Sequence, residues 1–159
     1  MTKCVITEAI EVIAKVMAKK ENMKICFTVL GEPIAKGRPK FFRRGEFMGT
    51  YTPNKTKTAE NDFLKQALLS SPDKPIGGAI SLDLKIYRSI PKSFSNKKKR
   101  LVDHGILLPT TKPDIDNYAK LVLDAMNSIF WNDDKQVVRL SAVKQYSSNP
   151  RIEVELIEL

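Results

Sequence analysis

Hydrophobic and polar positions alternate in residues 78–88, and three other stretches of the chain are rich in β-branched and aromatic residues. A period of two, or such a composition, predicts β-strands. The predicted strands cover residues 24–30, 78–88, 136–146 and 151–157. The connection at 147–150 contains Ser, Asn and Pro, which are turn residues, so the last two strands are expected to form a hairpin.

Apolar residues recur every three to four positions elsewhere, and this spacing predicts amphipathic helices. Two of them cover residues 5–20 and 56–70, and a third begins near Asp116. Ser95 or Asn96 is suited to cap a short helix before the third. A further hairpin, with its turn near Arg44 and Gly45, is expected before the second helix.

This order of elements predicts an α+β fold, with a mixed or antiparallel sheet and helices packed on one side. The 159 residues suit one domain, and neither a repeat nor an interdomain linker interrupts them. Residues 1–22 are interpreted as an appended amphipathic helix or an extension produced by an early start codon. Residues 23–159 then form the functional domain.

The charge balance indicates the class of partner. Lys and Arg number 27 against 18 Asp and Glu, which gives a net charge of +9 and favours a polyanion. A basic surface that merely confers solubility is the alternative. No apolar run is long enough to span a bilayer and no signal-peptide core is present, so a cytoplasmic protein without a membrane partner is expected.

Histidine and cysteine are too few to supply a familiar catalytic or metal site. His104 stands alone, which argues against a histidine metal site or a Ser-His-Asp triad. Cys4 and Cys26 lack zinc-ligand spacing, and both thiols are expected to be reduced and buried. Any chemistry therefore falls to carboxylates.

Carboxylates are concentrated between Lys112 and Asp134. Asp114 and Asp116 stand at the start of the third helix, where one lies on the entering loop while the other caps. Asp133 and Asp134 follow the helix, and a return of the chain there would add a third carboxylate. Hard cations such as Mg²⁺ take oxygen ligands, and two or three aspartates suffice. The alternative is that these aspartates only cap a helix and a turn.

Three motifs in this region resemble the RusA-type Holliday-junction resolvases. They are Lys-Pro-Asp-Ile-Asp-Asn at 112–117, Lys120 four residues after the second aspartate, and Phe-Trp-Asn-Asp-Asp followed by Lys-Gln-Val-Val at 130–138. A looser resemblance covers residues 23–69, through Lys-Gly-Arg-Pro and Tyr-Thr-Pro.

The resemblance implies a Mg²⁺-dependent endonuclease, with Mn²⁺ able to substitute, that acts as a homodimer on four-way DNA junctions in recombination and repair. It implies Asp114, Asp116 and Asp134 as metal ligands, with Asp133 as the alternative third ligand. Lys120 would be the catalytic lysine. No small-molecule substrate is implied.

Basic residues in two segments and beside the first aspartate are the candidate DNA contacts, because cations pair with phosphates and neighbouring aromatic rings stack on bases. They are Lys36, Arg38, Lys40, Arg43, Arg44, Lys97, Lys98, Lys99, Arg100 and Lys112. A non-catalytic DNA-binding protein and a nuclease for other branched or flap DNA are the competing functions. The first is disfavoured because carboxylates repel phosphate unless a cation lies between them.

Overall fold

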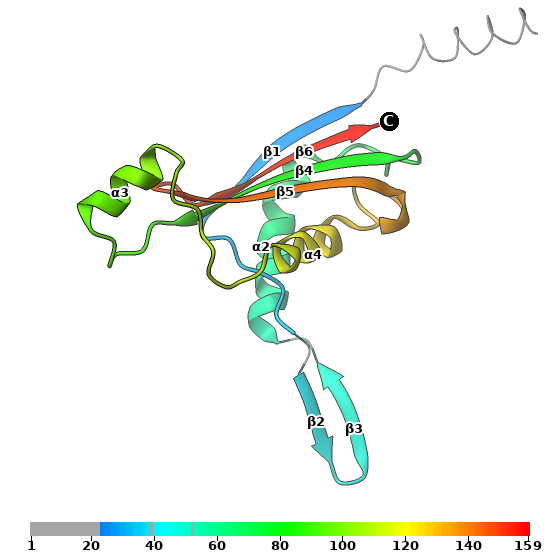
Figure 1. Ribbon diagram of the computed structural model, residues 1–159. Coiled ribbons are helices and arrows are strands. Elements are labelled where there is room, and N and C mark those ends of the chain that lie inside the picture. Colours follow the sequence, from blue (N-terminus) through cyan, green and yellow to red (C-terminus); the bar gives the residue numbers. More distant parts are fainter. Residues whose placement is uncertain (1–22, 39, 52) are drawn as a thin grey trace, which may run out of the picture.

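The computed structural model describes residues 23–38, 40–51 and 53–159. The helix predicted for residues 5–20 and the extension predicted for 1–22 lie outside this part. Figure 1 shows a sheet covered by helices on one face and a hairpin that projects away from both.

The sheet has four strands in the order β1-β6-β4-β5. β1 (Lys24–Leu30) and β4 (Ile80–Ser89) each pair antiparallel with β6 (Arg151–Glu158), whereas β5 (Val137–Ser147) pairs parallel with β4. The sheet is therefore mixed, and the predicted α+β class is confirmed.

The predicted hairpin of the last two strands is wrong, because β4 lies between β5 and β6. β4 is the most deeply buried strand, and Ile80, Leu82, Leu84 and Ile86 along it are essentially inaccessible to solvent. A central position gives such a strand a neighbour on both edges, so more of its apolar surface is buried. β5 lies at the edge of the sheet next to β4, and the turn at 147–150 carries the chain across the end of β4 to β6.

Two helices cover the inner face of this sheet (Figure 1). α2 (Asn54–Ala67) continues into the 3₁₀ turn η1 (Leu68–Ser70), and α4 (Ile115–Met126) packs beside it. The core includes Phe63 of α2, Leu121 of α4 and the buried Trp131 that follows α4. α4 is thus held firmly by its apolar side, which leaves its first turn at the surface.

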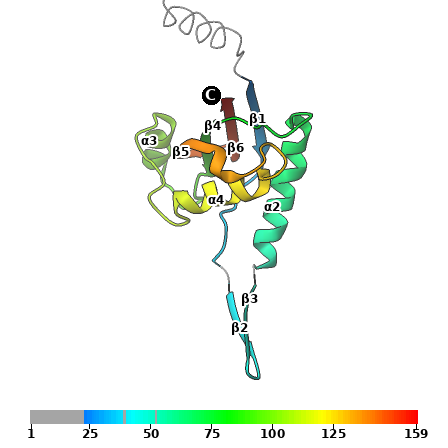
Figure 2. The same ribbon diagram turned by 90° about the vertical axis from the view of Figure 1, so that its right-hand side faces the viewer.

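The remaining elements lie at the periphery. α3 (Asn96–Asp103) lies at one end of the sheet, where Phe94 makes an edge-on ring contact with Tyr146 of β5 at 5.4 Å between centroids. β2 (Lys40–Arg44) and β3 (Phe47–Tyr51) form the predicted antiparallel hairpin. Figures 1 and 2 show that this hairpin extends well beyond the helices. None of the helices described is long and apolar enough to span a membrane.

The outer face of the sheet is polar. Ion pairs such as Lys24 with Glu155, at 2.8 Å, lie on it. Cys26 is exposed there, which corrects the expectation of a buried thiol. The reason is the alternation of β1, in which Phe27 and Val29 face the helices and Cys26 faces outward. Cys4 lies outside the described residues.

Candidate active site at the start of helix α4

The first turn of α4 presents two carboxylates to solvent. Asp114 is the N-cap residue, with extended backbone angles, but its side chain makes no capping hydrogen bond. Asp116 lies in the first helical turn. The buried side of the helix, which includes Tyr118 and Val122, fixes the direction in which this turn points. The carboxylate of Asp114 is therefore not used to cap the helix and is available to a ligand.

Asp116 is paired with Lys120, one helical turn further on. Their Oδ2 and Nζ atoms are 3.0 Å apart, and the hydrogen bond from Lys120 lowers the pKa of the Asp116 carboxyl below its ordinary value. Both side chains are more than half exposed. A surface pair of this kind contributes little to stability, because solvent screens it. The pair is therefore weak enough for another cation to replace Lys120.

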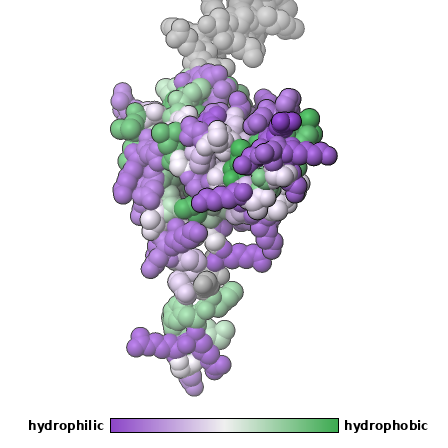
Figure 3. All heavy atoms as spheres, turned by 90° about the vertical axis from the view of Figure 1, so that its left-hand side faces the viewer, coloured by the Kyte–Doolittle hydropathy of each residue, from purple (hydrophilic) through white to green (hydrophobic). Residues whose placement is uncertain are grey.

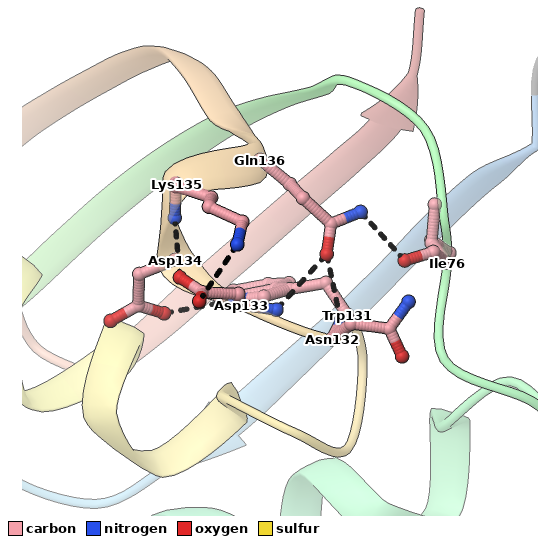
Figure 4. A network of polar contacts seen from close by, with 7 residues as sticks. All are labelled: Ile76, Trp131, Asn132, Asp133, Asp134, Lys135 and Gln136. Atoms are coloured by element: carbon pink, nitrogen blue, oxygen red, sulfur yellow. Dashed lines mark hydrogen bonds and ion pairs between the residues drawn. The ribbon is translucent and has the colours of Figure 1, made fainter.

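The two neighbouring aspartates after α4 have different partners. Figure 4 shows the indole of Trp131 directed at Asp134, and Trp131 Nε1 donates to Asp134 Oδ1 at 2.9 Å. The tryptophan is completely buried, so it is a rigid donor. Asp133 instead caps the 3₁₀ turn η2 (Asp134–Gln136), with its Oδ1 accepting from Lys135 N at 3.0 Å. That backbone hydrogen bond lowers the pKa of Asp133.

Gln136 holds the loop that carries both aspartates. Its Oε1 accepts from the backbone N–H groups of Asn132 and Asp133, at 2.9 and 3.0 Å. Its Nε2 donates to the backbone carbonyls of Ile76 and Gly78, each at 2.9 Å. Figure 4 shows Gln136 between the loop and the segment that contains Ile76. The amide thereby ties the Trp131–Gln136 loop to a second part of the chain.

Two residues that sequence reasoning missed support the loop before α4. Lys144 Nζ donates to the carbonyls of Thr111 and Pro113, at 3.0 and 2.9 Å. Arg88 donates through Nη1 to the carbonyl of Lys112 at 3.1 Å. Burial and the neighbouring Arg88 lower the pKa of Lys144, while the charge of Asp114 opposes this shift. Lys144 is in register with the buried Ile86 and so lies on the inner face of β5. A lysine at an inward-facing strand position was the sequence signal that could have identified its role.

The chemistry of these side chains fits a divalent cation, although they do not form a closed cage. Among the described residues, no three Asp, Glu, His or Cys side chains are grouped closely enough to hold a metal ion. The carboxylate of Asp114 nevertheless does not cap the helix, and that of Asp116 is held only by a weak surface ion pair with Lys120. The carboxylate of Asp134 is oriented by the buried indole N–H of Trp131. Carboxylate oxygens of this kind suit Mg²⁺.

The predicted DNA contacts lie on separate parts of the surface. Lys36 forms an ion pair with Asp124, and its backbone N–H donates to Asn117 O at 2.9 Å, so it joins the segment after β1 to α4. Arg38, Arg43, Arg44 and Lys112 are exposed, while the side chain of Lys40 lies outside the described part. α3 carries Lys97, Lys98, Lys99 and Arg100, all exposed.

Comparison with known proteins assigns this chain to a family. The model of the family Endodeoxyribonuclease RusA matches residues 31–157, and the chain belongs to that family. The uncharacterized protein YqaN of Bacillus subtilis (strain 168) is 46% identical over 142 residues, which cover 85% of this chain and 96% of YqaN. The crossover junction endodeoxyribonuclease rusA of Lactococcus phage r1t is 39% identical over 51 residues, 31% of this chain and 39% of the phage protein. Membership implies an endodeoxyribonuclease.

Proposed function

We propose that this protein is a Mg²⁺-dependent endodeoxyribonuclease that resolves four-way DNA junctions by paired nicking as a homodimer, in recombination and repair. The observation that carries the proposal is the hydrogen bond from buried Trp131 to Asp134, because this rigid donor orients a half-buried carboxylate at the edge of the core. Family membership and the crossover-junction activity for which the phage relative is named support the choice of reaction and substrate.

In this proposal Asp114, Asp116 and Asp134 would hold the cation, and their carboxylates would have to move closer together around it than they are in this structure. A bound divalent cation activates water and offsets negative charge on the phosphate. Lys120 leaves Asp116 and donates to the scissile phosphate, which lowers the energy of the transition state. Lys144 and Arg88 act through the Thr111–Pro113 carbonyls, because they set the path of the loop that carries Asp114.

A homodimer suits the substrate, because a four-way junction has near two-fold symmetry and needs two cuts. β5 supports the pairing of two copies. It is one of the two edge strands of the described sheet, and Val138, Leu140 and Val143 on it are exposed. Edge strands with free backbone groups and apolar side chains readily associate with another chain.

The test uses an end-labelled synthetic four-way junction beside a linear duplex and a flap of the same sequence, each with Mg²⁺, Mn²⁺ or EDTA. We expect symmetric paired nicks in the junction, only with metal, and none with the matched variant Asp116→Asn. Light scattering of the same preparation should give twice the 18.0 kDa chain mass. Junction binding without cleavage under all conditions would instead identify a non-catalytic DNA-binding protein. Preferred cleavage of the flap would show that flap DNA, and not the four-way junction, is the substrate.

A further inference from the structure

The hairpin β2–β3 exposes an unusual amount of aromatic surface. Phe41, Phe42, Phe47 and Tyr51 are between 40% and 82% exposed, although none of them lies at the core. Figure 3 shows hydrophobic and hydrophilic side chains side by side on this projecting arm. Folded monomers seldom leave so many large apolar groups together in water, and such patches mark binding surfaces.

Three of these rings form a row on one face of the hairpin. Phe42 lies between Phe47 and Tyr51, with ring centroids 6.2 and 6.3 Å away. The planes of the Phe47 and Tyr51 rings are inclined to that of Phe42 by 48° and 57°. The rings are therefore not stacked on one another, and they do not cover each other's faces. Phe41 pairs with Thr50 and directly precedes Phe42 in β2. Because successive side chains of a strand point to alternate faces, Phe41 lies on the other face of the hairpin.

Gly49 makes room for the central ring. A Cβ atom built on Gly49 would lie 2.8 Å from Cε1 and Cζ of Phe42, which is closer than real Cβ contacts allow. The ring of Phe42 therefore lies directly over the backbone of β3. Any side chain at position 49 would push this ring off the strand and break the row.

The charge around the row favours nucleic acid over a second copy of the arm. Residues 40–51 contain Lys40, Arg43 and Arg44 against one acid, Glu46. Arg44 is opposite Phe47 in the strand pairing, and so lies on the same face as the row. Two such arms would repel each other, whereas phosphates attract them. Aromatic rings beside cations bind single strands by stacking on bases while the cations neutralise phosphates.

We infer that the row formed by Phe42, Phe47 and Tyr51 is a stacking platform for unpaired bases at the branch point of a DNA junction. Duplex bases already hide their faces in their own stack, so the rings reach only bases that are unpaired or displaced. The inference rests on the proposed function and adds to it the part of the junction that the arm recognises: the opened centre, not the duplex arms.

The experiment measures binding in EDTA, so that it does not depend on cleavage. The full chain is titrated by fluorescence anisotropy with a labelled single strand, a duplex of the same length, and a four-way junction carrying 2-aminopurine at its centre. Phe42→Leu with Phe47→Leu should weaken single-strand binding by at least about tenfold, since each stacked base contributes roughly that factor. Duplex binding should stay within about twofold, and the 2-aminopurine signal should revert toward that of free junction.

Two further variants make the result specific. Phe41→Leu removes a ring from the opposite face of the same hairpin and should change single-strand affinity by less than about twofold. Gly49→Ala keeps every ring but displaces Phe42, and should weaken single-strand binding several-fold. The inference is overturned if the double variant binds single strands like the parent, if Phe41→Leu does equal damage, or if the double variant loses the dimer instead.

Failure of this inference is distinguishable from failure of the proposed function. A protein that binds single strands through the platform in EDTA but leaves junctions uncut in Mg²⁺ retains the platform and loses the nuclease assignment. A protein that nicks junctions in Mg²⁺ while its double variant binds single strands normally retains the nuclease assignment and loses the platform.

Discussion

Asp133 and Asp134 are adjacent, and the structure predicts that substituting them will have opposite consequences. Asp133 caps η2, whereas Asp134 accepts the indole N–H of a buried tryptophan. Asp133→Ala removes an N-cap, which typically costs about 1 kcal/mol. For a protein of this size that lowers the melting temperature by about 2–4 °C. Cleavage of a four-way junction should remain within a few-fold of the parent, because Asp133 is not a proposed metal ligand.

Asp134→Asn keeps an oxygen that accepts from Trp131 but removes the negative charge. The hydrogen bond changes from a charged to a neutral acceptor, which costs on the order of 1 kcal/mol. The cleavage rate should nevertheless fall by more than about a hundredfold, since even indirect supports of a metal site contribute factors of 10–100. Asp133→Asn is the matched control, because asparagine is an equally good N-cap and the substitution makes the same change of charge one residue away.

The measurements are thermal melting by circular dichroism and single-turnover cleavage at saturating enzyme over a range of Mg²⁺ concentration. If Asp133→Asn is inactive while Asp134→Asn cleaves normally, Asp133 and not Asp134 is the third ligand. If both asparagine variants cleave normally, neither aspartate is a ligand and the Trp131 hydrogen bond is only structural.

Three further predictions concern the lysines near the site and the arginines of the hairpin. Lys120→Ala should lower the single-turnover rate on the order of a hundredfold with little change in melting temperature, whereas a simple ion-pair partner of Asp116 would leave the rate within a few-fold. Lys144→Met removes two hydrogen bonds to loop carbonyls and should lower the free energy of unfolding by about 1–3 kcal/mol, measured by urea denaturation; unchanged stability would contradict that support. Neutralising Arg43 and Arg44 together should weaken junction binding and flatten its log–log salt dependence by up to about two units, and an unchanged slope would remove them from the DNA interface.

Local patterns in the sequence were enough to predict most elements of this fold. The β-branched and aromatic residues of 24–30 predict β1, and the turn near Gly45 predicts the hairpin β2–β3, because both signals arise from neighbouring residues. The helix expected near Asp116 begins at Ile115, with Asp114 as its N-cap residue. The resemblance to the RusA-type resolvases also singled out Asp114, Asp116 and Asp134 as candidate ligands, a selection that stays a prediction.

The partners of these elements were decided by tertiary structure. Nothing in the pattern of 136–157 reveals that β4 separates β5 from β6, because strand order depends on which distant strand most needs burial on both edges. The roles of Lys144 and Arg88 arise in the same way, from carbonyls that the fold brings to them.

The clearest division between the two levels lies at Asp133 and Asp134. The sequence alone determines that two carboxylates follow Trp131 in a motif that resembles a nuclease family, but it leaves the third ligand open between them. Because Trp131 is packed in the core, its indole N–H donates to Asp134, whereas Asp133 accepts a hydrogen bond from the backbone N–H of Lys135 in η2. A hydrogen bond depends on direction and distance in space, and adjacent residues of the same type acquire different partners only once the chain has folded.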